Sequence, residues 1–206
     1  MYHIFNTKKD ITLEKIGNIT ISGYSKSNYK TGYLIQPFNI YLDAGCESPI
    51  PANIICLSHG HLDHISALYS ILVESNKSIV MLDTCIKNDV QTMLNSMSSL
   101  NSGRKMIYSN WEPIISNEYK YIYSKNQTIY IYTFNLVHRV PCKAYGIKMI
   151  SNKLKPEYTL LKPEELRELK KTTVITYEYM YPMLLFISDT SIEGIINLPF
   201  NEYKLV

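Results

Sequence analysis

Three of the five histidines lie within six residues, in the run His59-Gly60-His61-Leu62-Asp63-His64. Imidazole nitrogens and carboxylate oxygens are ligands that zinc takes in catalytic sites, where one coordination position stays open for water. Without a cation, three imidazoles and a carboxylate packed this closely would repel one another or stay unsatisfied. The run therefore predicts a metal site.

The spacing within the run indicates how the ligands are shared. Alternate side chains of an extended backbone point to the same side, so His59 and His61 can reach one ion. Asp63 and His64 come one turn later, at the expected start of a helix, and can serve a second ion. The run alone therefore supplies ligands for two neighbouring metals.

Further ligands must come from elsewhere in the chain, and the sequence offers His138 and Asp189, each at the end of an expected strand. A single histidine or aspartate at such a position more often has a structural role than a metal-binding one. Asp43, in Leu42-Asp43-Ala44-Gly45, is either a partner that orients a ligand imidazole or an ordinary turn aspartate. The isolated His3 has no assigned role.

The surrounding elements explain how these residues would be positioned. Asn53–Ser58 is an apolar run of strand length that leads directly to His59, and a helical stripe follows it at Ile65, Leu68, Tyr69, Leu72 and Val73. The patterns predict further strands at 19–22, 31–36, 39–43, 78–82 and 183–187, a hairpin over 119–134 with its turn at 125–127, and helices over 87–100 and 163–171. Strands with interspersed helices predict an α+β architecture.

Composition sets the broad class. The chain has 206 residues, 46% hydrophobic and 19% charged, which predicts one globular domain over residues 1–206. No apolar run reaches membrane-spanning length and no secretory signal is visible, so a cytoplasmic or nuclear location is expected. The four cysteines lack C-x-x-C spacing and are interpreted as buried or incidental thiols: Cys46, Cys56, Cys85 and Cys142.

At the motif, the chain resembles the metallo-β-lactamase superfamily. The residues that carry the likeness are His59-Gly60-His61-Leu62-Asp63-His64 after a buried strand, together with Leu42-Asp43-Ala44-Gly45. The resemblance implies a four-layer αββα sandwich with metals at one edge.

Other stretches resemble the short-form tRNase Z branch, the tRNA 3′-processing endoribonucleases, from about residue 16 to the end. The segment 134–147 is similar to the one that carries that family's third metal-binding histidine, here His138. The segments 154–158, 166–170 and 173–176 resemble the stretch before its bridging aspartate. Ser188-Asp189-Thr190 stands where the family has Gly-Asp-Thr.

This resemblance implies the chemistry. His59, His61 and His138 would hold one zinc, Asp63 and His64 a second, and Asp189 would bridge them, with Asp63 as the family's candidate general base. A metal-bound hydroxide would attack the phosphodiester and remove the 3′ trailer from precursor tRNA. Precursor tRNA or another RNA is therefore the expected partner, with no membrane involvement, and the family implies a homodimer.

The chain also departs from the family pattern. It has no histidine after His138, where the family has a further ligand and a histidine that protonates the leaving group, so the domain is interpreted as truncated at its C-terminus, with one zinc as the alternative to two. Ser66-Ala67 replaces a glycine pair, and no segment resembles the family's Gly-Pro-rich arm. Two alternatives stay open: a catalytically impaired metal-binding or RNA-binding homologue, and a thioester or lactone hydrolase of the same superfamily.

The net charge of +3 permits a polyanionic partner without requiring one. Several cations are candidates for phosphate contacts, although for any one of them solvated surface is the better explanation: Arg104, Lys105, Arg139, Lys143, Lys148, Lys153 and Lys155.

Overall fold

The structure is a computed structural model that describes residues 7–13, 17–47, 50–114, 117–124 and 127–205. His3 and the hairpin-turn residues Lys125 and Asn126 lie outside these ranges. The chain divides into two compact units. Unit 1 comprises residues 1–117, 133–145 and 186–198, and unit 2 comprises residues 118–132, 146–185 and 199–206.

Two sheets carry the strands. The first sheet has the order β1-β2-β3-β4-β5-β6-β7, antiparallel from β1 to β4 and parallel from β4 to β7. Its strands are β1 (Thr7–Leu13), β2 (Gly17–Lys26), β3 (Lys30–Gln36), β4 (Ile40–Leu42), β5 (Ile54–Cys56), β6 (Ile79–Asp83) and β7 (Trp111–Ile114). The second sheet has the order β11-β10-β9-β8, built from β8 (Glu118–Ser124), β9 (Gln127–Leu136), β10 (Cys142–Leu154) and β11 (Thr176–Phe186).

Helices accompany both units. They are α1 (Leu62–Ile65), α2 (Leu68–Glu74), η1 (Thr84–Ile86), α3 (Lys87–Ser102), η2 (Pro156–Tyr158), α4 (Pro163–Thr172), α5 (Ile192–Ile195) and η3 (Phe200–Glu202). The α+β class with two sheets and helices is confirmed. Within the described ranges, none of the helices has the length and hydrophobicity that crossing a bilayer would require.

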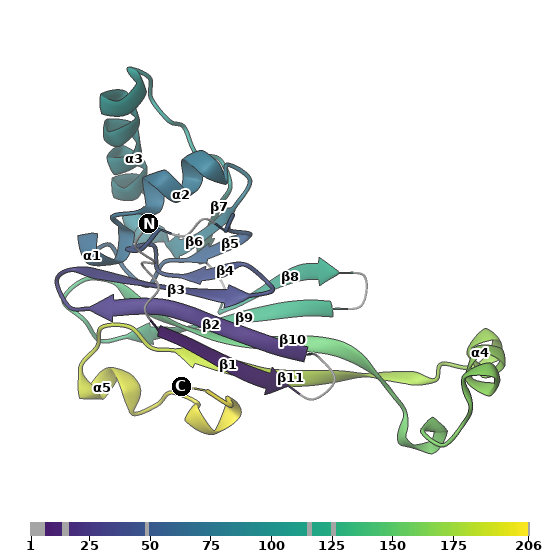
Figure 1. Cartoon of the computed structure of the whole chain (residues 1–206). Coiled ribbons are helices and arrows are strands. Elements are labelled where there is room, and N and C mark those ends of the chain that lie inside the picture. Colours follow the sequence, from purple (N-terminus) through teal and green to yellow (C-terminus); the bar gives the residue numbers. More distant parts are fainter. Residues whose placement is uncertain (1–6, 14–16, 48–49, 115–116, 125–126, 206) are drawn as a thin grey trace. The chain divides into compact units, whose positions relative to one another are not determined.

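The core of unit 1 forms where helices pack on the parallel strands. Figure 1 shows α2 and α3 near the parallel strands, and many of the buried side chains come from α2, α3, β5 and β6. Ile55, Leu68, Leu72, Val80 and Leu94 are all fully buried there. Burial of such aliphatic side chains, at roughly 1.5–3 kcal/mol each, is the main favourable term that fixes β5 and hence the chain that follows it.

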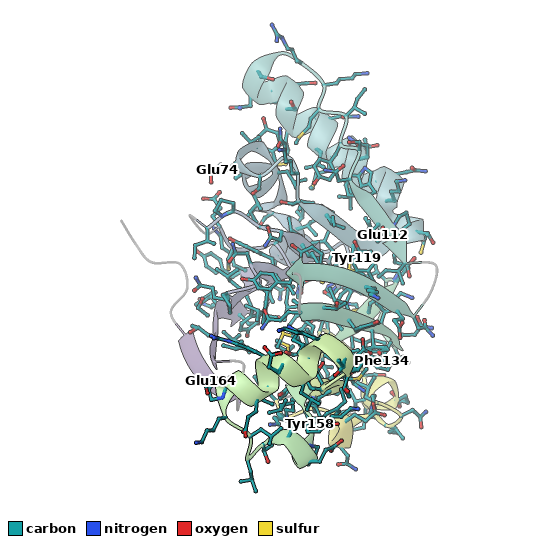
Figure 2. All side chains as sticks on the ribbon, turned by 90° about the vertical axis from the view of Figure 1, so that its right-hand side faces the viewer. Glu74, Glu112, Tyr119, Phe134, Tyr158 and Glu164 are labelled. Carbon is teal, nitrogen blue, oxygen red and sulfur yellow. The ribbon has the colours of Figure 1, made fainter. Side chains whose placement is uncertain are left out.

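Most of β10 and β11 lies in unit 2, where the two strands pair as a long ribbon, and η2 and α4 form the connection between them (Figure 1). α4 begins with Pro163, and the side chain of Glu165 accepts a hydrogen bond from the backbone N–H of Lys162 at 2.7 Å. This is the capped, charged helix that the sequence predicts. No residue of α4 is buried, and Figure 2 shows its side chains, with Glu164 labelled near its start.

One prediction about a helix is wrong in detail. The stripe from Ile65 to Val73 predicts one helix, but the structure has α1 and α2 separated at residues 66–67. The backbone N–H of Ala67 donates to the carbonyl of Ala44 at 2.8 Å rather than to a helical carbonyl. Ile65, Leu68 and Leu72 are buried, as the stripe predicts, while Val73 is 57% exposed.

Candidate metal centre

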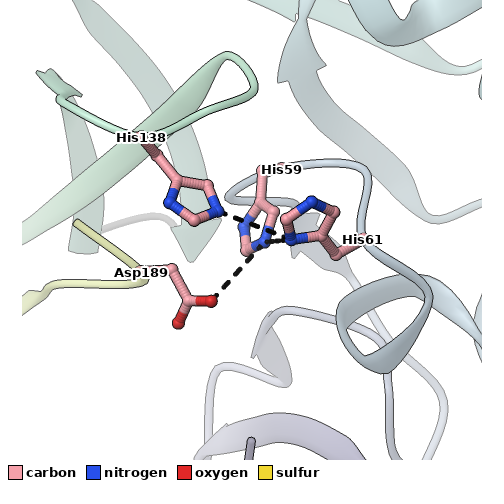
Figure 3. A group of neighbouring side chains, drawn as sticks. All are labelled: His59, His61, His138 and Asp189. Atoms are coloured by element: carbon pink, nitrogen blue, oxygen red, sulfur yellow. Dashed lines mark hydrogen bonds and ion pairs between the residues drawn. The ribbon is translucent and has the colours of Figure 1, made fainter. Parts of the chain in front are cut away.

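The histidine run is positioned by the end of β5. Leu57, Ser58 and His59 continue that strand and are completely buried, after which the chain turns through Gly60 and His61 into α1. Residue 138 follows the end of β9, and residue 189 follows the end of β11. All of these segments belong to unit 1, and Figure 3 shows their side chains converging on one point.

Four side chains at this point each offer one ligand atom, and the four atoms lie within 4.8 Å of one another: His59, His61, His138 and Asp189. His61 Nδ1 lies 3.0 Å from His59 Nε2 and 3.5 Å from His138 Nε2. Asp189 Oδ2 lies 4.0 Å from His59 Nε2. The two residues that the sequence could only suggest as distant partners, His138 and Asp189, therefore lie beside the histidine run.

The donor set fits a tetrahedral zinc-type ion. Zinc bonds to nitrogen and oxygen are about 2.0–2.2 Å long, which places tetrahedral donors about 3.4 Å apart. Three of the donor pairs, at 3.0, 3.5 and 4.0 Å, lie on either side of that value, and all four donor atoms lie within 4.8 Å of one another. Three imidazoles and one carboxylate are also the donor types that such ions prefer. This group of four could hold a divalent metal ion.

Asp63 and His64 lie next to this group but are not part of it. His64 Nε2 is 3.6 Å from Asp63 Oδ2 and 3.9 Å from Asp189 Oδ2. Asp189 Oδ2 is thus about equally far from His64 Nε2 and from His59 Nε2, at 3.9 and 4.0 Å. One carboxylate oxygen therefore lies between the two sets of donors.

Behind the imidazoles, the buried carboxylate of Asp43 collects three contacts. Its Oδ1 accepts from the backbone N–H of Ser58 at 2.7 Å, and its Oδ2 accepts from the Ser58 hydroxyl at 2.9 Å. The same Oδ2 lies 2.7 Å from His64 Nδ1. The Ser58 hydroxyl also lies 2.9 Å from His59 Nδ1. Asp43 therefore supports His64 directly and His59 through Ser58.

Burial and neighbouring charges set the protonation of the histidines. Burial, reinforced by the surrounding imidazoles, lowers the pKa of His59 to about 3. Burial and the charge of Arg139 lower the pKa of His61. For His64, burial opposes protonation, but the hydrogen bond and charge of Asp43 outweigh it and raise the pKa, while complete burial raises the pKa of Asp43. His59 and His61 are held as neutral imidazoles, the form that binds metal.

A tight turn places Asp43 beneath the site. Asp43 has a φ of +60°, in the left-handed region, and Gly45 follows in the same turn. A methyl group at Gly45 would overlap the backbone carbonyl of Asp63, so the turn and α1 approach each other at backbone distance. The backbone N–H of Ala44 donates to the carbonyl of His64 at 2.7 Å, which fixes that approach.

The donor group opens into a cavity of about 610 Å³ that also includes the tip of the β2–β3 hairpin. At that tip the backbone N–H of Asn28 donates to Asp63 Oδ2 at 3.1 Å. Ser58 and Asn28 were not among the site residues expected from the sequence. Ser58 directly precedes His59 and could have been singled out by that position, whereas no sequence signal links Asn28 to Asp63.

Comparisons with known proteins give relatives of one kind. No family model matches the chain. Over 198 residues it is 25% identical to the chloroplastic tRNase Z TRZ2 of Arabidopsis thaliana, covering 92% of this chain and 54% of the relative. It is 24% identical to tRNase Z TRZ1 of the same plant, covering 89% of this chain and 66% of the relative. The chain thus spans about half to two thirds of the length of these curated relatives.

Solved structures with partial similarity include the metallo-β-lactamase fold protein YhfI from Bacillus subtilis, at 19% identity and a TM-score of 0.39, covering 60% of this chain and 52% of that one. Human tRNase Z, short form (ELAC1), has 11% identity and a TM-score of 0.35, covering 69% and 63%. The sequence comparisons extend over about nine tenths of this chain. They confirm that it resembles tRNase Z, a branch of the metallo-β-lactamase superfamily.

Proposed function

We propose that this chain is a metal-dependent hydrolase, and more specifically a zinc-dependent endoribonuclease of the tRNase Z type that removes 3′ trailers from precursor tRNA. The convergence of His59, His61, His138 and Asp189 within 4.8 Å carries the proposal, because it supplies ligand atoms for a divalent ion of the kind that hydrolases use. The resemblance to plant tRNase Z proteins supports RNA as the substrate class.

The site residues divide into two sets. His59, His61 and His138 would hold one ion, and Asp63 and His64 would hold another, with Asp189 between them. When bound, such ions activate water and neutralise the charge that develops on a phosphodiester during hydrolysis.

The remaining chemistry belongs to side chains that position and accept protons. Asp43 would hold the His64 proton on Nδ1, which would leave Nε2, beside Asp63 and Asp189, available as a ligand for an ion. Asp63 is the proposed general base, and its Oδ2 is oriented by the backbone N–H of Asn28. The Asp63 carboxylate lines the cavity and can accept a proton from the attacking water there.

The test combines metal content with cleavage. Metal per chain is measured by elemental analysis on purified protein, and a precursor tRNA with a 3′ trailer is the substrate. We expect bound zinc, cutting at the trailer junction, and a loss of cutting of at least about a hundredfold in His61→Ala and Asp189→Ala.

His3→Ala provides a histidine-matched control, since His3 is the one histidine outside the two site segments. It should keep wild-type metal content and cutting. Metal binding without cutting of RNA would contradict the nuclease and favour a binding homologue. Cutting that survives His61→Ala would show that the activity comes from a contaminant.

A further inference from the structure

One cation lies at the mouth of the metal site. The cavity is lined by residues of the β2–β3 tip, of α1 and of the segments that carry His138 and Asp189. Among the lining residues that the structure describes, Arg139 is the only lysine or arginine. Asp63 and Asp189 line the same cavity. An anionic substrate that enters would therefore meet two carboxylates and a single guanidinium group.

The contacts of Arg139 leave it available. Its side chain is exposed, and its Nε donates to His61 Nε2 at 3.3 Å. Within the described ranges it has no carboxylate at ion-pair distance. In contrast, Lys143, also in unit 1, is paired with Asp83 at 3.2 Å. An arginine with no acidic partner beside a hydrolytic site has donors to offer a ligand.

The hydrogen bond between Arg139 and His61 is incompatible with metal on His61. A neutral imidazole carries one proton, so accepting from Arg139 at Nε2 requires that proton to be on Nδ1. Nδ1 is the atom of His61 that faces His59 and His138, and metal binding there needs its lone pair. The proton then moves to Nε2, where it meets the N–H of Arg139 instead of accepting from it.

A metal on His61 Nδ1 would therefore remove this acceptor from Arg139, whose exposed guanidinium lines the cavity. We propose that Arg139 binds the phosphate of the scissile or adjacent diester at the mouth of the metal site. Guanidinium presents paired donors that match phosphate oxygens, and a planar bidentate contact also orients the diester. This proposal rests on the proposed function, since it names a substrate-binding residue of the same site.

A binding assay tests Arg139 without relying on turnover. The probe is a short fluorescein-labelled oligoribonucleotide, used with zinc-loaded protein, and a matched probe carries uncharged methylphosphonate linkages. We expect Arg139→Gln to weaken binding of the charged probe about tenfold and to leave the weak binding of the uncharged probe unchanged. Arg139→Lys should restore part of the loss, because it keeps the charge without the paired donors.

Arg167→Gln is the control, as Arg167 is exposed in α4 and does not line the cavity. Equal binding of the charged probe by wild type and Arg139→Gln would overturn the proposal. An equal loss of binding with the charged and the uncharged probe would also overturn it, because such a loss would indicate a general structural defect rather than a lost phosphate contact.

Metal affinity gives a second readout. Chelator competition should show that Arg139→Gln binds zinc at least as tightly as wild type, because a donor competing for His61 has been removed. A clear fall in affinity would mean that Arg139 supports His61, and would overturn the proposal.

Activity separates the two proposals. If wild-type protein binds the probe through Arg139 but cuts no RNA, the nuclease fails and the phosphate contact stands. If wild type cuts RNA and Arg139→Gln does so with an unchanged KM, the nuclease stands and the phosphate contact fails.

Discussion

The carboxylate of Asp43 holds two imidazoles of the site through contacts made entirely in the interior. It accepts from the backbone and hydroxyl of Ser58 and lies 2.7 Å from His64 Nδ1, with no exposed surface of its own. Partners of this kind fix which nitrogen of a histidine carries the proton and raise its basicity toward a metal. We therefore expect the turn aspartate to influence metal affinity through these imidazoles.

Asp43→Asn tests that control. Asparagine keeps the shape and tolerates the left-handed φ of +60°, but it is neutral and has only one acceptor oxygen. We expect zinc affinity, measured by chelator competition, to fall about 10- to 100-fold. Asp89→Asn, the control, removes an exposed carboxylate in α3 and should leave the zinc affinity unchanged. If Asp43→Asn bound zinc as tightly as wild type, Asp43 would be an ordinary turn residue with no effect on the metal site.

Gly45 governs the spacing between the β4 turn and α1. A β-carbon at this position would overlap the backbone carbonyls of Asp63 and Thr31, neither of which can rotate away. Since α1 carries Asp63 and His64, any shift that relieves the overlap also displaces these residues. The packing of one turn against one short helix therefore sets part of the site geometry.

Gly45→Ala should accordingly lower the free energy of unfolding by about 1–3 kcal/mol, the usual cost of overpacking. Gly60→Ala is the matched control, because nothing lies within 4 Å of the added methyl and its φ is not in the left-handed range. It should stay within about 0.5 kcal/mol of wild type. Denaturant unfolding of both variants measures the difference, and equal destabilisation would contradict the packing argument.

At the level of elements, the sequence predicted what local pattern can encode. The apolar run 53–58 became β5 and its continuation, and α3 ends at Gly103 with a φ of +69°, as the Asn-Ser-Gly sequence indicates. The hairpin over 119–134 formed with Tyr121 opposite Ile129. β1, β7 and the thirteen-residue β10 were not predicted; β10 shows only partial alternation of buried and exposed residues.

What the sequence could not supply were contacts between distant segments. In the sequence, Arg139 is one of several cationic residues without a distinguishing pattern. Only its contact with His61, 78 residues earlier in the chain, sets it apart from the others. Likewise the break between α1 and α2 depends on the carbonyl of Ala44, which no helical periodicity reveals. Such contacts arise from packing and have no local signature.

On the scale of the whole chain, the candidate site lies within one compact unit but draws on three separated stretches. His59 to His64, His138 and Asp189 all belong to unit 1, and α4 belongs to unit 2. A ligand that binds only the folded form adds stability by mass action, about 2.7 kcal/mol at a hundred times Kd. A bound metal ion should therefore stabilise the three stretches of unit 1 together against local unfolding.

Hydrogen exchange of the backbone amides, with and without zinc, measures this stabilisation. We expect slower exchange on zinc addition in residues 57–66, 137–140 and 187–191, with little change in α4, which has no residue in the site. Uniform protection along the chain, or none in the segment around Asp189, would contradict an ion shared by the three stretches.

The hydroxyl of Ser188 donates to that of Ser58 at 2.9 Å, joining the chain before Asp189 to the chain before His59. The tRNase Z pattern that this chain resembles has glycine at the position of Ser188, and glycine has no hydroxyl with which to make this contact. This hydrogen bond contributes to stability only when both hydroxyls are present. The two positions are therefore coupled energetically: removing the Ser58 hydroxyl should cost more stability in the wild-type chain than in a Ser188→Gly background.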